Sequence, residues 1–289
     1  MPFIDTPRLR FHYRTQGDPD GLPMLLLHGS FASGRWWEPF LSILPKEILA
    51  VVPDLRGCGE SDQTDTGYAI DEQAEDVHTL VEALGWDGFD LVGHSSSGAV
   101  AVEYAMRYAH TLHSLILVSS APVEGVRTPL EAYPVLESLR TERELLGRAL
   151  RNLMPSLADS AVHQPFIEQL VTDAQSMAPA AFTAVARALD HWDRFQDAGQ
   201  LTLPTLLIWG DQDTIVDHAT TVRSLIAIPG TNNLEILRNV GHSPMIEAPV
   251  ALAERIIDFI SEEFDEFEEI RGSMEEGKSN TDLTDKTDF

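Results

Sequence analysis

The chain has little of several features that often decide the class of a protein. It holds one cysteine, Cys58, among 289 residues, so neither an intrachain disulfide nor a thiolate metal cage can form. Basic residues are also scarce, since 20 of them stand against 46 acidic residues and the net charge is −26. An excess of that sign repels phosphate backbones and anionic membranes, so we expect neither nucleic acid nor a membrane as partner.

Long apolar runs are missing as well. The longest, such as MLLL and TLLIW, are far too short to cross a bilayer. The first residues, MPFIDTPRLRFHY, lack the basic region and the apolar region of a secretory signal peptide. We therefore expect a soluble, cytoplasmic protein.

Short apolar runs are present, and they recur along the chain. Each ends at Gly, Asp, Ser or His, and a helical pattern follows most of them, as in DEQAEDVHTLVEALG after the second run. Strands that are apolar throughout and alternate with helices indicate a mostly parallel sheet with helices on both faces, so the predicted fold class is α/β. The predicted strands are MLLLHG, ILAVVPD, FDLVGH, LHSLILVSS, TLLIWGD and LEILRNVGH.

One long segment interrupts this alternation. Residues 123–199 contain helix-forming stretches such as TERELLGRALRNLM but no strand-like run, which predicts a helical cap inserted into an α/β core of residues 1–122 and 200–265. The core should close with the helix PVALAERIIDFISEEF. Residues 266–289 are polar and acidic, and we expect them to be a disordered tail.

The stretch LVGHSSSGAV, residues 91–100, places three serines between a predicted strand and a predicted helix. A serine at the tip of a sharp strand-to-helix turn needs small residues two positions before and two after it. Ser95 meets this condition, with Gly93 and Ser97 as neighbours, whereas His94 would be too bulky for a turn centred on Ser96. Ser95 is thus the candidate nucleophile, and the Ser96 N–H would lie at the helix start, where it favours an oxyanion.

A serine hydroxyl needs a base to take its proton and an acid to orient that base. His242 follows the last predicted strand and Asp213 follows the one before it, and the order Ser, Asp, His fits this arrangement. Asp211 and Glu124 remain alternatives for the acid. His28 and His94 are expected to hold loops or pack rather than to react.

Five motifs in sequence now carry a resemblance: LLLHGSFASGRWWEPF, VVPDLRGCGESD, LVGHSSSG, PTLLIWGDQD and VGHSPMIEAP. Together they resemble a capped, single-domain α/β-hydrolase, which implies Ser95 as nucleophile, His242 as base and Asp213 as acid. The same resemblance implies an oxyanion hole formed by the backbone N–H groups of Ser30 and Ser96. The chain departs from the family pattern at Ser97 and Asp217, where relatives often have Gly and Pro. Candidate pocket residues are Phe31, Trp37, Trp192, Phe195 and Val216.

The predicted activity is hydrolysis of a small carboxylic ester or lactone through an acyl-enzyme, with no cofactor and no metal. Three alternatives remain open: an amidase or iminopeptidase-like enzyme, a carbon–carbon bond hydrolase, and a non-catalytic, ligand-sensing member of the fold. The loop GCGESD lacks the full glycine pattern of a dinucleotide site and runs into polar residues rather than a helix. The sequence does not indicate an oligomeric state.

Overall fold

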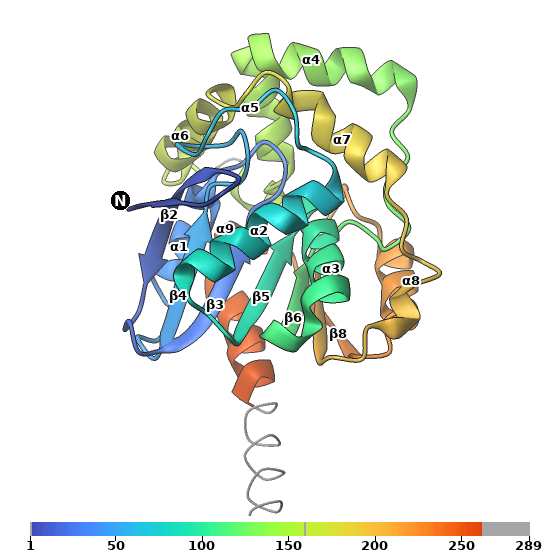
Figure 1. The fold of residues 1–289 in the computed structure, drawn as a ribbon. Helices are drawn as coiled ribbons and strands as arrows, with labels where there is room; N and C mark the ends of the chain where they lie inside the picture. The colour runs from blue at the N-terminus through green and yellow to red at the C-terminus, as the bar shows by residue number, and fades with distance from the viewer. Residues whose placement is uncertain (1, 159, 262–289) are drawn as a thin grey trace, which may run out of the picture.

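The computed structural model describes residues 2–158 and 160–261. At its centre lies an eight-stranded sheet with the order β1-β2-β4-β3-β5-β6-β7-β8 (Figure 1). β3 to β8 are mutually parallel, and β1 and β2 add an antiparallel edge. The strands are β1 Phe3–Asp5, β2 Arg10–Gln16, β3 Leu22–Leu27, β4 Ile48–Pro53, β5 Phe89–His94, β6 Leu112–Val118, β7 Thr205–Gly210 and β8 Thr231–Leu237.

The predicted α/β fold is confirmed, and all six predicted runs form strands of the parallel part. β5 and β7 are buried at every position, as expected for strands that helices cover on both faces. β1 and β2 were not predicted. β2 buries His12 and Arg14 beside Phe11, so its sequence RFHYRTQ does not read as an apolar run.

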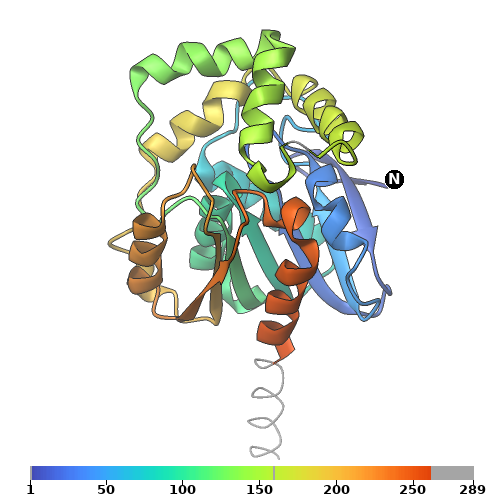
Figure 2. The same ribbon diagram turned by 180° about the vertical axis from the view of Figure 1, so that it is seen from behind.

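Helices cover both faces of the sheet. α2 and α3 lie on the face toward the viewer in Figure 1, and Figure 2 shows α1, α9 and the helix of residues 249–261 on the opposite face. The predicted stop of α2 is observed, since Gly85 ends it with φ 71°. Besides the helix of residues 249–261, the helices of at least four residues are α1 Glu38–Leu41, α2 Ile70–Leu84, α3 Ser96–Tyr108, α4 Tyr133–Thr141, α5 Arg143–Asn152, α6 Gln164–Gln175, α7 Ala181–His191, α8 His218–Ala227, α9 Pro244–Glu247 and the 3₁₀ helix η1 Gly34–Trp37.

Helices α4 to α7 follow β6 and precede β7, and they lie above the sheet at the end to which β5 and β6 lead (Figures 1 and 2). Apolar side chains of α5 and α6 join the hydrophobic cluster beneath them, so the segment packs on the sheet layer rather than standing apart from it. The two ends of this segment lie side by side, where the N–H of Arg194 donates to the carbonyl oxygen of Val123 at 2.7 Å.

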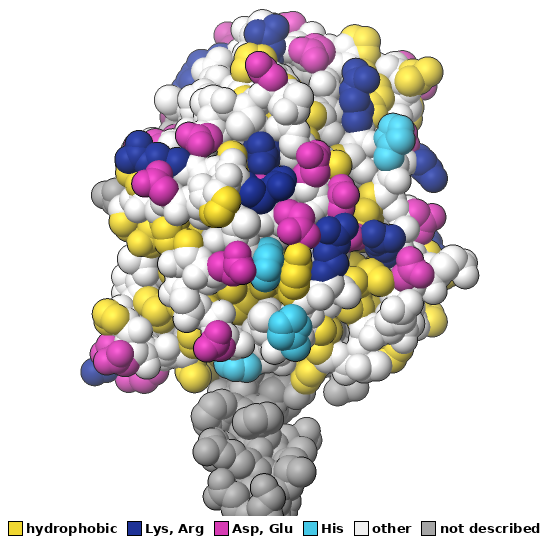
Figure 3. Space-filling model, in the orientation of Figure 1, with side chains coloured by type: hydrophobic (Ala, Val, Ile, Leu, Met, Phe, Trp, Pro, Cys, Tyr) yellow, Lys and Arg dark blue, Asp and Glu magenta, His cyan; other side chains and the backbone are white. Residues whose placement is uncertain are grey.

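The surface mixes charges of both signs. Figure 3 shows acidic side chains next to Lys and Arg side chains on the face seen in Figure 1. Among the described residues, no helix is both long enough and apolar enough to cross a membrane. The predicted tail, residues 266–289, lies outside the described part of the chain.

Candidate active site

The three residues expected to carry the chemistry come from the ends of parallel strands. Ser95 follows β5, Asp213 lies in the loop after β7, and His242 lies in the loop after β8. Parallel strands end at one edge of a sheet, and that edge is where ligands bind in open α/β folds. The structure brings the three side chains into hydrogen-bond contact there, although they lie far apart in the sequence.

Ser95 stands at a sharp turn between β5 and α3. Its backbone has φ 55° and ψ −124°, a conformation that residues other than glycine rarely adopt and that costs about 1–3 kcal/mol. Both sides of the turn are tied to the end of β6: the Ser95 N–H donates to Val118 at 3.1 Å, and its carbonyl oxygen accepts from Ala121 at 2.9 Å. The neighbouring strand thus holds the strained backbone in place.

Small neighbours make the turn possible. A Cβ on Gly93 would lie 2.8 Å from both the Ala101 Cβ and the Ser97 carbonyl oxygen, and one on Gly29 would lie 2.8 Å from the Ser95 Cβ. Ser97, where family members often have glycine, is accommodated because its hydroxyl finds backbone partners. It accepts the His94 N–H at 3.0 Å and lies 3.0 Å from the carbonyl oxygen of Leu27, to which it can donate.

Of the three adjacent serines, Ser95 contacts the histidine. Its Oγ lies 2.8 Å from Nε2 of His242, and Nδ1 of His242 lies 2.8 Å from Oδ2 of Asp213. The Ser96 hydroxyl is bonded to Ser30, and the Ser97 hydroxyl to the backbone. This chain of contacts can pass the Ser95 proton to His242 and stabilise the resulting imidazolium beside Asp213.

Asp213 is held as a carboxylate. Its other oxygen, Oδ1, accepts the N–H groups of Ile215 at 2.8 Å and Val216 at 3.0 Å. Burial raises the pKa of Asp213, but the His242 hydrogen bond and charge together with these N–H groups outweigh it, and the net pKa is lowered.

The two other acids considered from the sequence point elsewhere. Asp211 accepts the Asn239 N–H at 2.7 Å and lies 3.5 Å from Nη1 of Arg238. Glu124 pairs with Arg223 at 2.8 Å. Within the described structure, Asp213 is therefore the acid that contacts His242.

The loop around His242 is fixed by partners that sequence reasoning did not assign. One oxygen of Glu247 accepts the N–H groups on both sides of the histidine, from Gly241 at 2.9 Å and Ser243 at 3.2 Å. The His242 N–H donates to the carbonyl oxygen of Leu153, just beyond α5, at 3.0 Å. Glu247 belongs to the quoted motif VGHSPMIEAP, but the contact to Leu153 had no signal in the sequence.

His94 has a further role beyond the packing expected of it. Its ring lies beside those of Trp36 and Trp37, and its Nε2 donates to the carbonyl oxygen of His242 at 2.8 Å. Burial, followed by the charge of His242, lowers the pKa of His94 to about 3. His94 is thus a neutral donor that supports the His242 loop. His28, as expected, holds loops, with Nδ1 donating to Gly29 and Nε2 accepting from Leu55.

Ser30 and Ser96 lie next to each other at the same edge, and their hydroxyl oxygens are 3.0 Å apart. Among the described residues, the backbone N–H of neither serine donates to a protein acceptor. Phe31 follows with φ 57°, and its ring lies 5.7 Å from the ring of Phe182 in α7. A cavity of ≈ 20 Å³ adjoins both serines, with Met177 and Val185 among its other lining residues.

The other candidate pocket residues lie in separate environments. Val216 lines a depression of ≈ 220 Å³ beside Ile215 and Glu124. Trp192 is buried and donates to Glu103, and it lines a groove of ≈ 530 Å³ between residues 65–71 and α7.

The structure does not bring Trp37 or Phe195 to the Ser95 site. Trp37 is fully buried against Phe40 and His94, because the turn of η1 directs it into the core. Phe195 is 43% exposed on the segment after α7.

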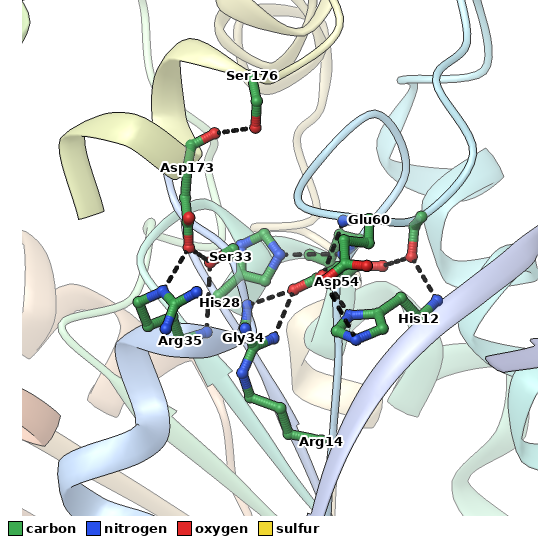
Figure 4. Close-up of polar contacts among 12 residues, drawn as sticks. His12, Arg14, His28, Ser33, Gly34, Arg35, Asp54, Glu60, Asp173 and Ser176 are labelled. Atoms are coloured by element: carbon green, nitrogen blue, oxygen red, sulfur yellow. Dashed lines mark hydrogen bonds and ion pairs between the residues drawn. The ribbon is translucent and has the colours of Figure 1, made fainter. Parts of the chain in front are cut away.

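A second buried Asp–His pair lies near the N-terminal strands (Figure 4). Asp54 receives Nδ1 of His12 at 2.7 Å, Nη1 of Arg14 at 3.1 Å and the N–H groups of Gly34 and Glu60. In the part of the chain that the structure describes, no cluster of His, Cys, Asp and Glu could hold a metal ion.

Comparison with known proteins identifies the family of this chain. A model of the alpha/beta hydrolase family matches residues 24–255. The chain belongs to the alpha/beta hydrolase family. It is 28% identical over 282 residues to the monoacylglycerol lipase abhd6-B of Xenopus laevis, covering 87% of this chain and 79% of the relative. The family and its relatives indicate a hydrolase.

Solved structures share the fold of this alpha/beta hydrolase. A putative lipase of Acinetobacter baumannii AYE superposes with a TM-score of 0.80 at 23% identity, covering 92% of each chain. The enol-lactonase of Burkholderia xenovorans LB400 gives a TM-score of 0.77 at 24% identity, covering 90% of this chain and 100% of that one. At such identities the likeness concerns the fold alone.

Proposed function

We propose that the protein is a serine hydrolase that cleaves a small carboxylic ester or lactone through an acyl-enzyme on Ser95. The observation that carries the proposal is the unbroken series of contacts from Ser95 Oγ to His242 Nε2, and from His242 Nδ1 to Asp213 Oδ2, at 2.8 Å each. A strained serine in contact with an oriented histidine is the arrangement that activates a hydroxyl for attack on a carbonyl carbon.

The reaction has two halves. His242 takes the Ser95 proton while Oγ attacks the carbonyl carbon, and the tetrahedral oxyanion then expels the alcohol, which takes its proton from His242. A water molecule, deprotonated by the same histidine, attacks the acyl-enzyme and releases the carboxylic acid and free Ser95. Asp213 keeps the imidazole in the productive tautomer and stabilises the imidazolium in both halves.

We assign the oxyanion hole to the backbone N–H groups of Ser30 and Ser96. Support comes from their adjacency to Ser95, from the position of Ser96 as the first residue of α3, and from the lack of a protein acceptor for either N–H among the described residues. N–H groups fixed before the reaction stabilise developing negative charge without having to reorganise.

We also propose that residues 123–199 act as the cap of the site and that Phe31 and Val216 line its pocket. Phe182 and Val185, both on α7, support this proposal, because the first contacts Phe31 and the second lines the cavity beside Ser30 and Ser96. The carbonyl of Leu153, which receives the His242 N–H, belongs to the same segment.

Esters and lactones are favoured over amides because their leaving groups need less protonation, and because lipases, esterases and lactonases stand among the proteins that this chain resembles. An amidase or iminopeptidase-like activity and carbon–carbon bond hydrolysis would use the same three residues. A ligand-sensing protein would keep the contacts without turnover.

The test is labelling with a fluorophosphonate, followed by mass spectrometry of the labelled peptide. We expect native protein to be labelled at Ser95, heat-denatured protein to remain unlabelled, and Ser95→Ala to lose both labelling and ester hydrolysis. A panel of short-chain esters, lactones and amino-acid arylamides then ranks the substrate classes. Full ester turnover by purified Ser95→Ala would overturn the mechanism, and labelling without multiple turnovers on any substrate would favour the ligand-sensing alternative.

A further inference from the structure

The two residues assigned to the oxyanion hole are both serines, and their side chains are bonded to each other. Ser30 Oγ and Ser96 Oγ are 3.0 Å apart, and only 7% of the Ser96 surface is exposed. The backbone donors come from two separate segments, the loop after β3 and the first turn of α3. An oxyanion hole made of backbone N–H groups requires no hydroxyl at either position, so the contact between the two hydroxyls has a separate cause.

The loop that carries Ser30 is under strain. Phe31 has φ 57°, a left-handed conformation that costs a non-glycine residue about 1–3 kcal/mol. Ser95, beside Ser96, is strained in the same sense with φ 55°. Each strained turn would relax to a more ordinary backbone unless its contacts held it, and the Ser95 turn is held by its hydrogen bonds to Val118 and Ala121.

The surrounding contacts explain how the loop is held. On one side, the ring of Phe31 lies 5.7 Å from that of Phe182 in α7. On the other, the hydroxyl pair connects Ser30 directly to the first residue of α3. The adjoining cavity of ≈ 20 Å³ has Leu55, Met177 and Val185 among its lining residues, and the partner that each hydroxyl contacts there is the other hydroxyl.

We propose that the Ser30 and Ser96 hydroxyls act as a pair of positioning residues that fixes the distance between the two oxyanion N–H donors. This inference rests on the proposed hydrolase function and deepens it. The pair stabilises the transition state through donor geometry, since a donor displaced by a fraction of an ångström loses much of its hydrogen bond to the oxyanion. It does not bind the ground-state substrate.

The experiment compares Ser30→Ala, Ser96→Ala and the double variant with wild type on 4-nitrophenyl acetate. Each single change should lower kcat by about 10- to 100-fold with KM within about twofold, because the loss occurs in the transition state. The double variant should lose no more than the worse single variant, because either change alone breaks the pair. Ser30→Thr, which keeps the hydroxyl, should recover most of kcat.

Two controls keep the outcomes distinct. Ser42→Ala removes an exposed hydroxyl bonded to the Pro39 carbonyl and should leave kcat and KM unchanged. Thermal unfolding of every variant shows which of them are folded. If Ser30→Ala does not fold, the kcat values of the single variants Ser96→Ala and Ser30→Thr test the pair instead. The positioning role of the pair would be overturned by unchanged kcat in the alanine variants or by a rise in KM alone. It would also be overturned if the loss of kcat in the double variant were the product of the two single losses. If wild type neither hydrolyses esters nor reacts with fluorophosphonate, the hydrolase proposal itself fails.

Discussion

Two buried carboxylate–histidine pairs in this molecule have nearly the same geometry and very different surroundings. Nδ1 of His242 lies 2.8 Å from Asp213, and Nδ1 of His12 lies 2.7 Å from Asp54. The difference is on the far side of each ring. Nε2 of His242 contacts the Ser95 hydroxyl at 2.8 Å, whereas Nε2 of His12 is buried without a hydrogen bond among the described residues.

The carboxylates differ as well. Asp213 accepts hydrogen bonds from its histidine and from two N–H groups, so His242 is the only ionisable side chain within hydrogen-bond distance of it among the described residues. Asp54 also accepts the Arg14 guanidinium and the N–H of Gly34, and it links β2, β4 and the start of η1 (Figure 4). In this molecule, the Asp–His pair whose second nitrogen meets a hydroxyl is the one we propose for catalysis, and the other pair joins segments of the fold.

Removal of each histidine should separate the two roles by the largest margin. His242→Ala should lower ester turnover by about 10³- to 10⁶-fold with a small change in stability, because the base is lost. His12→Ala should instead lower the free energy of unfolding by about 2–3 kcal/mol while the folded protein keeps its turnover. Steady-state kinetics and urea unfolding of both variants check this, and a turnover loss in His12→Ala equal to that of His242→Ala would contradict it.

Neutralising each acid gives the next largest contrast. Asp213→Asn should lower kcat by about 10⁴-fold, since the amide favours the wrong tautomer of His242. Asp54→Asn should remove the carboxylate that Arg14 and His12 share and destabilise the fold by about 3 kcal/mol, since Arg14 keeps only its contact with Glu38. The same two assays measure both variants. If Asp54→Asn proved as stable as wild type, Asp54 would not join the segments as described.

A third buried carboxylate, Glu103 on α3, extends the comparison to a site with no histidine. It accepts Nε1 of Trp192 at 2.9 Å and the guanidinium groups of Arg194 and Arg107. Glu103→Gln should cost about 2 kcal/mol of stability and leave kcat unchanged, because the charge-assisted bonds are lost without an effect on Ser95. Urea unfolding and esterase assays at pH 7 measure this, with the surface change Glu254→Gln as control.

The smallest effect expected is on the pH dependence of stability. Burial raises the pKa of Glu103, but Arg194, Trp192 and Arg107 outweigh it and lower the pKa to about 2, from the ordinary 4.5. A carboxyl whose folded-state pKa is depressed stabilises the protein above its unfolded pKa, and that contribution disappears as the pH falls. The unfolding free energy should therefore decline between about pH 4.5 and pH 2, and more gently in Glu103→Gln. Equal slopes in urea titrations across this range would count against the assignment.

The sequence alone carried enough information for the parallel sheet and for the residues at its edge. β3 to β7 are largely apolar, and β8 ends in the apolar residues Ile236 and Leu237, so each strand could be recognised by itself. The strand ends then placed Ser95, Asp213 and His242 together. The edge strand β2 escaped because the burial of His12 and Arg14 depends on Asp54, about 40 residues away. The residues around His12 and Arg14 in the sequence give no indication of this partner.

Side-chain direction was the other limit. Trp37 and Phe195 were plausible pocket residues by type, yet the first packs into the core and the second faces solvent, since neighbours in space decide which way a ring points. Ser30 and Ser96 were singled out for their backbone groups, and the bond between their hydroxyls appears only once the two segments are seen together.

The hydrogen bond that joins Arg194 to Val123 has a consequence for recombination of this fold. A segment whose two ends lie together does not change the path of the strands around it, so its length can vary, provided that its apolar residues still cover the hydrophobic cluster beneath it. A chimera that carries the corresponding helices of another family member should fold if its junctions fall at these two residues and its helices present matching apolar residues to that cluster. To be active, the transplanted piece must also offer one carbonyl oxygen where Leu153 now receives the His242 N–H.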